Sequence, residues 1–127
     1  MRGELLASLL RAEVLPHKNV GDVRGMGLFW GVEIVQDKET KQPFAFEDKH
    51  ADRVAEVLLR RGVAVYNGYG CVSEKLTKRL HVADPQADGW DGDHIMLCPP
   101  YTITEDEVRF LVREVRIAIE VVLGQDP

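Results

Sequence analysis

The sequence predicts an α+β fold in two layers, with a small antiparallel sheet of three or four strands covered on one face by three helices. Three segments carry apolar residues at helical spacing, and two strand-like runs flank a short turn that contains glycine. A chain of 127 residues is long enough to bury one core. We therefore expect residues 1–127 to form a single domain.

The first helix is predicted over residues 2–14. Apolar residues recur there three and four positions apart, and Pro16 then ends the pattern. The recurring residues are Leu5, Leu6, Leu9, Leu10 and Val14.

A hairpin is predicted over residues 20–35, which read Val-Gly-Asp-Val-Arg-Gly-Met-Gly-Leu-Phe-Trp-Gly-Val-Glu-Ile-Val. Residues 28–35 alternate with a period of two, as a strand does, and pair with the run before them across a turn at Gly25 to Gly27. Because Phe29 and Trp30 are adjacent on a strand, at most one of them points into the helix-covered core.

The glycines of this stretch also suggest a nucleotide-binding loop. A dinucleotide fingerprint, however, places its glycines after a strand and at the start of a helix, whose N-terminus meets the pyrophosphate. Here Gly25, Gly27 and Gly31 lead into a strand. A hairpin turn is therefore favoured over a phosphate-binding loop.

The second helix is predicted over about residues 47–61, after a polar turn at Asp37 to Pro43. Basic residues at its end suit the helix dipole, and Gly62 can adopt the left-handed conformation that closes a helix. Its apolar face consists of Ala51, Val54, Ala55, Leu58 and Leu59.

Short strands are predicted at residues 63–66 and 94–98, and Pro99-Pro100 ends the second of them. The last helix starts at a capping box, in which Thr104 and Glu107 each satisfy an unpaired backbone N–H. Its apolar residues are Val108, Leu111, Val112, Val115, Ala118, Ile119 and Val122.

A long Asp-rich loop is predicted between these two strands. It lacks the spacing of an EF-hand, so a solvated loop is favoured over a metal site. The possible donors are His81, Asp84, Asp88, Asp91, Asp93 and His94.

The composition argues against several classes of protein. Sixteen basic residues against twenty-one acidic ones give a net charge of −5, which does not favour nucleic acid as a partner. No apolar run is long enough to cross a membrane, so we expect a soluble protein of the cytoplasm or an organelle matrix. Cys71 and Cys98 are predicted to be reduced, with Cys98 buried and inert in its strand.

Three stretches resemble the C-terminal small domain of class III aminotransferases, which are pyridoxal-phosphate enzymes of fold type I. They are residues 20–35, residues 63–66 with the glycine-rich stretch that follows, and residues 92–107, which include Leu-Cys-Pro-Pro-Tyr. The resemblance covers nearly the whole chain.

The resemblance implies the C-terminal portion of an enzyme that transfers an amino group between an amine or omega-amino acid and a keto acid. In this family the lysine that carries the cofactor lies in a large domain that precedes the small one. No lysine here has the matching context, so we expect this chain alone to bind no pyridoxal phosphate and to be inactive. The lysines are Lys18, Lys38, Lys41, Lys49, Lys75 and Lys78.

The implied partners are the large domain and, in the complete protein, a second subunit of a homodimer. The alternative is a free-standing, non-catalytic interaction module of the same fold. The reading frame upstream of Met1 distinguishes the two, because only the first requires it to encode a domain with the lysine.

The resemblance also identifies Tyr66 and Met96 as candidate substrate-pocket residues, although packing is an alternative role for both. Some members of the family bind the substrate carboxylate with an arginine at one of these two places. Neither Met nor Tyr can replace a bidentate guanidinium. Residues 75–90 form an insertion relative to the family, and Arg79 within it is a candidate replacement cation.

An apolar surface without a partner is expected on a domain separated from a larger one, with an area above roughly 600 Å². The candidates are Leu5, Leu9, Phe29, Trp30 and Tyr101.

Overall fold

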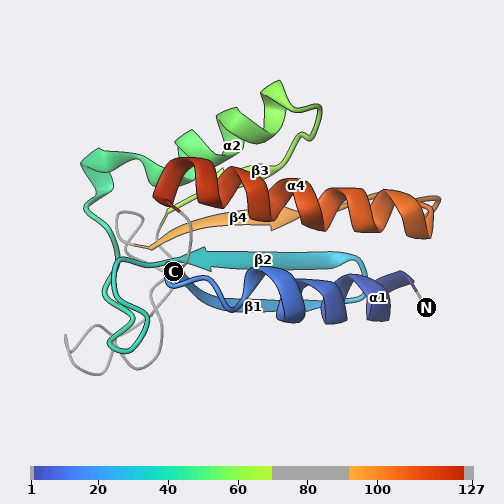
Figure 1. Cartoon of the computed structure of the whole chain (residues 1–127), viewed down its shortest axis with the longest axis horizontal. Helices are drawn as coiled ribbons and strands as arrows, with labels where there is room; N and C mark the ends of the chain where they lie inside the picture. Colours follow the sequence, from blue (N-terminus) through green and yellow to red (C-terminus); the bar gives the residue numbers. More distant parts are fainter. Residues whose placement is uncertain (1, 70–91, 125–127) are drawn as a thin grey trace.

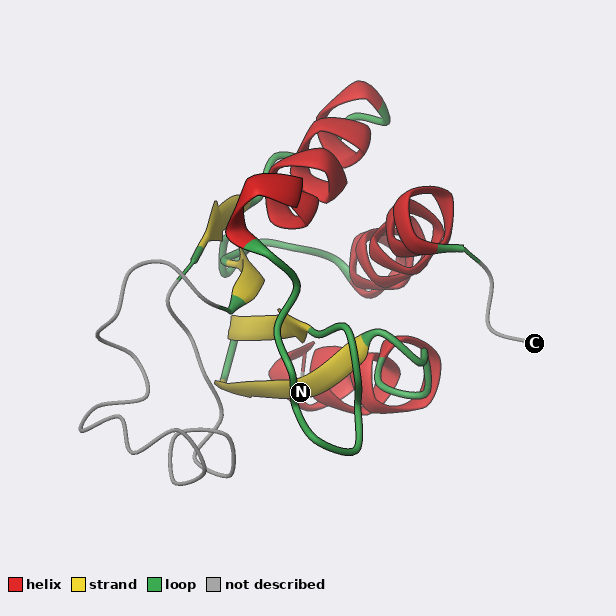
Figure 2. Ribbon diagram, turned by 90° about the vertical axis from the view of Figure 1, so that its left-hand side faces the viewer, coloured by secondary structure: helices red, strands yellow, loops and turns green. Residues whose placement is uncertain are grey.

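The computed structural model describes residues 2–69 and 92–124. They form a four-stranded antiparallel sheet with helices on one face, which confirms the predicted α+β class (Figure 1). Figure 2 shows the two layers edge-on. In chain order the elements are α1 (Arg2–Leu9), the π-helical turn η1 (Leu10–Val14), β1 (Val20–Met26), β2 (Phe29–Ile34), the 3-10 turn η2 (Phe46–Asp48), α2 (His50–Arg60), β3 (Tyr66–Gly68), β4 (Asp93–Leu97) and α4 (Glu105–Leu123).

The three predicted helices are present. Together α1 and η1 span the predicted residues 2–14. The second helix is split, because Lys49 has a φ of 54° and separates η2 from α2. At the start of α4, the Thr104 hydroxyl accepts from the Glu107 N–H at 3.1 Å, and the Thr104 N–H donates to the Glu107 carboxylate at 3.2 Å. This confirms the capping box.

The hairpin between β1 and β2 turns one step later than predicted. Met26 pairs with Phe29, so Gly27 and Leu28 form a two-residue turn, and Gly27 has a φ of 59°. Gly25 lies within β1 instead. The Trp30 indole N–H donates to the Gly27 carbonyl at 2.9 Å and ties the turn to the strand.

The predicted strand at residues 63–66 is wrong, since β3 starts at Tyr66. The reason is the end of α2. Gly62 has a φ of 92°, and the Val63 N–H donates to the Leu58 carbonyl at 2.8 Å, so this backbone closes the helix. The strand begins only where the chain has left that motif.

The sheet order is β1-β2-β4-β3, and β4 pairs with both β2 and β3. Along each strand, alternate side chains point to the helices and form the core. Trp30 is buried and Phe29 is 58% exposed, which confirms that they point to opposite faces. The largest fully buried side chains include Leu6, Leu10, Ile34, Leu58, Ile95, Leu97 and Ile119.

Three of the five residues predicted to form an unpartnered surface belong to the core or its edge. Trp30 is buried, and Leu5 and Leu9 pack against the core, because α1 turns both toward the other helices and the sheet. Phe29 and Tyr101 are exposed as predicted, Tyr101 to 89%.

Candidate functional site on the outer face of the sheet

The face of the sheet that points away from the helices is the candidate site, and we call it the outer face. Strand register places its side chains in rows that cross several strands. One row contains Asp22, Glu33, His94 and Gly68, and the next contains Arg24, Gly31, Met96 and Tyr66.

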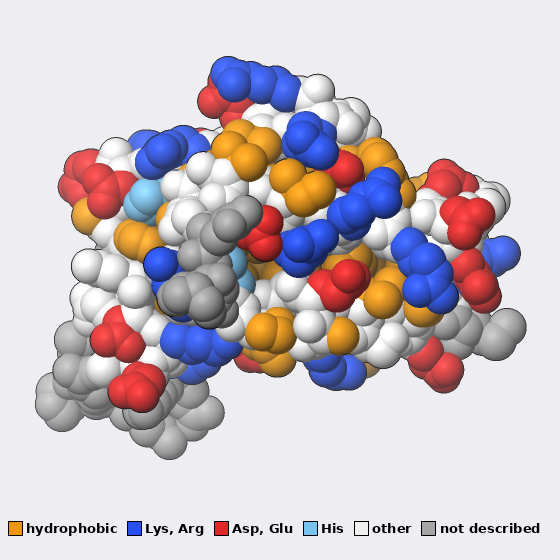
Figure 3. Space-filling model, in the orientation of Figure 1, with side chains coloured by type: hydrophobic (Ala, Val, Ile, Leu, Met, Phe, Trp, Pro, Cys, Tyr) orange, Lys and Arg blue, Asp and Glu red, His pale blue; other side chains and the backbone are white. Residues whose placement is uncertain are grey.

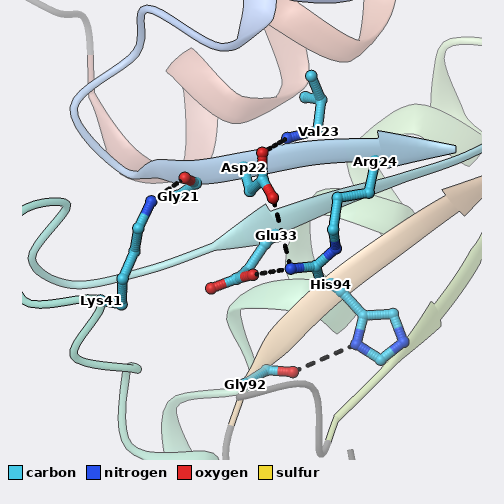
Figure 4. A network of polar contacts seen from close by, with 8 residues as sticks. All are labelled: Gly21, Asp22, Val23, Arg24, Glu33, Lys41, Gly92 and His94. Atoms are coloured by element: carbon cyan, nitrogen blue, oxygen red, sulfur yellow. Dashed lines mark hydrogen bonds and ion pairs between the residues drawn. The ribbon is translucent and has the colours of Figure 1, made fainter. Parts of the chain in front are cut away.

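An ion-pair network lies at one end of this face (Figure 4). An Arg24 guanidinium nitrogen lies 2.9 Å from a Glu33 carboxylate oxygen and 3.5 Å from Asp22. The Lys41 ammonium donates to the Gly21 carbonyl beside them. Two carboxylates, Asp22 and Glu33, and two cations, Arg24 and Lys41, therefore lie close together at this end of the sheet. Their formal charges sum to zero.

Glu33 is the buried member of this network, with only 3% of its surface exposed. Burial raises the pKa of the Glu33 carboxyl, because the charged form loses its hydration, while Arg24 and Lys41 lower it. Its ion pair with Arg24 spans the hairpin and holds the guanidinium against the sheet.

His94 extends the polar network onto β4. Its Nδ1 lies 3.2 Å from the Gly92 carbonyl oxygen, which can only accept, so Nδ1 carries the proton in this contact. A Cβ at Gly68 would lie 2.9 Å from the His94 Nε2. Glycine at that position leaves room for the imidazole ring to lie across β3.

Tyr66 and Met96, the candidate substrate-pocket residues, are direct cross-strand neighbours on the outer face. Tyr66 is 68% exposed and Met96 is partly buried. Their row continues across Gly31 to Arg24 on β1. The structure thus brings the two candidates together, and their role in binding substrate stays a prediction.

Sequence reasoning missed the Arg24–Glu33 pair. The signal was available in the hairpin, because pairing about a two-residue turn sets Arg24 opposite Gly31 and Asp22 opposite Glu33. Because the sequence analysis placed the turn one residue too early, at Gly25 to Gly27, it could not predict the pairing of β1 with β2.

Asp93 is not part of a solvated loop, as was predicted, but is fully buried in β4. Its carboxylate accepts from the Ala51 N–H at 2.9 Å, in the first turn of α2, where backbone N–H groups have no partner within the helix. Burial raises the pKa of Asp93, and the bond from Ala51 lowers it. Asp93 in β4 therefore caps the start of α2.

The remaining predicted loop donors, His81, Asp84, Asp88 and Asp91, lie outside the described residues, as do Cys71 and Arg79. Within residues 2–69 and 92–124, no three His, Cys, Asp or Glu side chains are grouped so that they could hold a metal ion.

Three of the predicted lysines, Lys38, Lys41 and Lys49, make contacts within the described part of the chain. Lys38 and Lys41 donate to backbone carbonyls, of Leu15 and Gly21 respectively. The Lys49 ammonium lies 3.5 Å from the centre of the Phe46 ring. These three amines stabilise turns and an aromatic contact.

Cys98 is exposed, not buried as predicted, because it directly follows buried Leu97 at the end of β4 and lies on the opposite face, away from the core. Over the described residues, no helix has the length and apolar character needed to span a membrane.

The known proteins that match most of this chain are aminotransferases. It is 39% identical over 110 residues to an uncharacterized aminotransferase of Schizosaccharomyces pombe, a match over 87% of this chain and 21% of that protein. The crystal structure of adenosylmethionine-8-amino-7-oxononanoate aminotransferase from Methanocaldococcus jannaschii superposes with a TM-score of 0.71 and 31% identity, over 96% of this chain and 22% of that one.

A transaminase structure from the marine bacterium Virgibacillus is similar at a TM-score of 0.75 and 28% identity, over 95% of this chain and 23% of that one. No protein-family model matches the chain.

Fold and outer face together define a two-layer α+β domain whose sheet has helices on one side only. The chain is homologous to one segment of the aminotransferases, which confirms the resemblance found in its sequence. It spans about a fifth of the length of the relatives it matches.

Proposed function

We propose that the chain is the C-terminal part of a class III, pyridoxal-phosphate-dependent aminotransferase. The complete enzyme would transfer an amino group between an amine or omega-amino acid and a keto acid. The observation that carries the proposal is the match itself, which includes 96% of this chain but only 22% of a solved aminotransferase, at a TM-score of 0.71. A free-standing interaction module does not account for that pattern.

In this proposal a preceding domain supplies the cofactor site, and the present chain covers it. Covering the site excludes water and positions the substrate. Tyr66 and Met96 would lie at the mouth of the substrate pocket, and the enzyme would act as a homodimer in the cytoplasm or an organelle matrix. The adjacent position of the two side chains on the outer face, with Tyr66 exposed, supports this role.

The test begins with the coding sequence upstream of Met1, which should encode a domain with a cofactor-binding lysine. That complete polypeptide, incubated with an amine donor, should convert its bound cofactor from the pyridoxal to the pyridoxamine form, seen as an absorbance change. Tyr66→Ala and Met96→Ala should alter its substrate preference. Leu59→Ala, at an exposed apolar residue of α2, is the matched control.

An upstream frame without such a domain would overturn the proposal and favour the interaction module. Equal substrate preference in Tyr66→Ala, Met96→Ala and Leu59→Ala would overturn the assignment of the pocket residues alone.

A further inference from the structure

Three buried polar atoms near the start of α2 have no role in the proposed function. On the helix side of the molecule, exposed apolar side chains are scattered among acidic and basic ones (Figure 3). Near the start of α2, by contrast, three polar atoms are closed off from solvent, and none has a hydrogen-bond partner among the described residues. They are Asp93 Oδ1, His50 Nδ1 and the Tyr69 hydroxyl. Because burying a polar group without a hydrogen bond is costly, each of these atoms needs a partner.

Strand register places Tyr69 beside Asp93. β3 and β4 are antiparallel and Gly68 pairs with His94, so Tyr69 follows β3 at the level of Asp93. On its other side Asp93 pairs with Ile34, which is fully buried on the helix-facing side of the sheet. The fully buried carboxyl of Asp93 therefore lies between the sheet and α2, with Tyr69 as its neighbour.

His50 reaches the same place from α2. It is the first residue of that helix and directly precedes Ala51, whose N–H donates to Asp93 Oδ2 at 2.9 Å. The His50 ring packs on the Phe44 ring, with the two ring centres 4.1 Å apart, and only 12% of the His50 side chain is exposed. The helix start thus holds the imidazole next to the buried carboxyl.

The protonation of His50 makes its Nδ1 an acceptor. Burial lowers the pKa of His50, while the nearby Asp93 carboxylate raises it, so the ring is neutral near pH 7. Its Nε2 lies 4.0 Å from a carboxylate oxygen of Asp48, which can only accept. We therefore assign the ring proton to Nε2, which leaves Nδ1 with a free lone pair.

The Tyr69 hydroxyl is a donor. Burial raises the pKa of Tyr69 to about 12, and the Asp52 and Asp93 carboxylates also raise it, so the hydroxyl keeps its proton. The Asp52 carboxylate accepts instead from the Asn67 side chain. Together with the acceptors on Asp93 and His50, the three groups offer two acceptors and one donor.

A water molecule matches this set. It can donate one proton to Asp93 Oδ1 and the other to His50 Nδ1, and its oxygen can accept from the Tyr69 hydroxyl. Buried waters typically make about three hydrogen bonds to such groups. An ammonium ion has no acceptor for the Tyr69 proton, and within the described ranges no three His, Cys, Asp or Glu side chains are grouped to hold a metal ion.

From these observations we infer that one water molecule binds between Asp93, His50 and Tyr69. It joins β4 to the start of α2 and to the residue that follows β3. With the Ala51 N–H on Oδ2 and the water on Oδ1, both oxygens of the buried carboxylate are satisfied. The site is independent of the aminotransferase proposal, which assigns no role to these three side chains.

A crystal structure of this chain, at a resolution that shows ordered water, tests the site directly. The crystals are grown without ammonium salts, so that a peak cannot be an ammonium ion. We expect one peak of density within about 2.6–3.2 Å of Asp93 Oδ1, His50 Nδ1 and the Tyr69 hydroxyl. A site without density, or a direct hydrogen bond from Asp93 to His50 or Tyr69, would overturn the inference.

The variant His50→Phe gives a second test in solution. It keeps a ring that packs on Phe44 but removes the acceptor, so the unfolding equilibrium constant, measured in urea, should rise about threefold to tenfold. Asp48→Asn is the matched control, because it changes only the exposed carboxylate 4.0 Å from Nε2, and its effect should stay below about twofold.

An equal cost for His50→Phe and Asp48→Asn would show that His50 acts through Asp48, and it would contradict the water site. A His50→Phe variant as stable as the parent chain would contradict it as well. If His50→Phe does not fold, the density in the parent crystal decides, since that measurement requires no substitution.

Discussion

At the scale of single residues, Gly27 is the most constrained position of the hairpin. Its φ of 59° is one that side chains with a Cβ rarely adopt, and open space surrounds the position where a Cβ would lie. Gly27→Val should therefore cost about 1–3 kcal/mol of unfolding free energy through backbone strain alone. Urea unfolding of the two proteins measures this difference.

Two other glycines serve as comparisons for Gly27. A Cβ at Gly31 would make ordinary contacts at 3.8 Å, so Gly31→Ala should change stability little. A Cβ at Gly25 would lie 2.2 Å from the Phe29 carbonyl oxygen, so Gly25→Ala should disrupt the hairpin by collision. Unchanged stability in Gly27→Val would mean that the turn lies elsewhere.

At the scale of elements, the start of α4 depends on Thr104. Its hydroxyl accepts the Glu107 N–H, which would otherwise have no partner in the helix. Thr104→Ala should destabilise the domain by about 0.5–2 kcal/mol, as measured by chemical unfolding. Thr102→Ala, at an exposed residue before the helix, is the control. Equal effects of the two substitutions would exclude a capping role.

The contact between α2 and α4 should make stability depend on pH. The Arg61 guanidinium donates to the Glu114 carboxylate, and this bond lowers the pKa of Glu114 although burial opposes it. A carboxyl whose pKa is lowered by folding stabilises the folded protein fully at pH values above its ordinary pKa of about 4.3. This contribution to the free energy of unfolding is lost as the pH falls from there through the lowered pKa. The same bond raises the pKa of Arg61, which stays charged throughout this range.

The loss of stability caused by Glu114→Gln should therefore be larger at neutral pH than in acid, as measured by urea unfolding at both. Differences between variant and parent are the useful quantity, because burial raises the pKa values of Glu33 and Asp93 and shifts stability in the opposite direction. Glu56→Gln, which removes an exposed pair with Arg60, should show little pH effect. A pH-independent cost of Glu114→Gln would refute the assignment.

At the scale of the whole molecule, the chain on its own should neither retain pyridoxal phosphate nor transfer amino groups. Lys38, Lys41 and Lys49 are engaged in structural contacts. After incubation with the cofactor and gel filtration, the absorbance near the visible edge should disappear. A retained band, together with a lysine found modified by mass spectrometry after borohydride reduction, would contradict this prediction.

Local patterns were enough to predict most of the fold. Apolar spacing located α1, α2 and α4, and the Thr104–Glu107 box marked the start of the last helix, because periodicity and caps depend only on neighbouring residues. The alternation through Phe29 and Trp30 likewise predicted their opposite faces. The start of β3 was missed, since the Val63 N–H closes α2 instead of joining the sheet.

The candidate site was only partly predictable, because it is assembled across strands. Tyr66 and Met96 were named from family resemblance, but their pairing is a matter of strand register. The ion pair of Arg24 with buried Glu33 depends on register as well. Because the β1–β2 turn was predicted one residue too early, the sequence analysis did not predict this ion pair.

The sequence by itself determined where the three helices and the β1–β2 hairpin lie, and which known family the chain resembles. Tertiary structure alone decided that Asp93 caps α2, that Trp30 is covered while Phe29 is exposed, and that the start of α1 packs against the β1–β2 turn. The physical reason is that periodicity is set by the local backbone, whereas burial, desolvation of a carboxylate and strand pairing depend on residues that are distant in the chain.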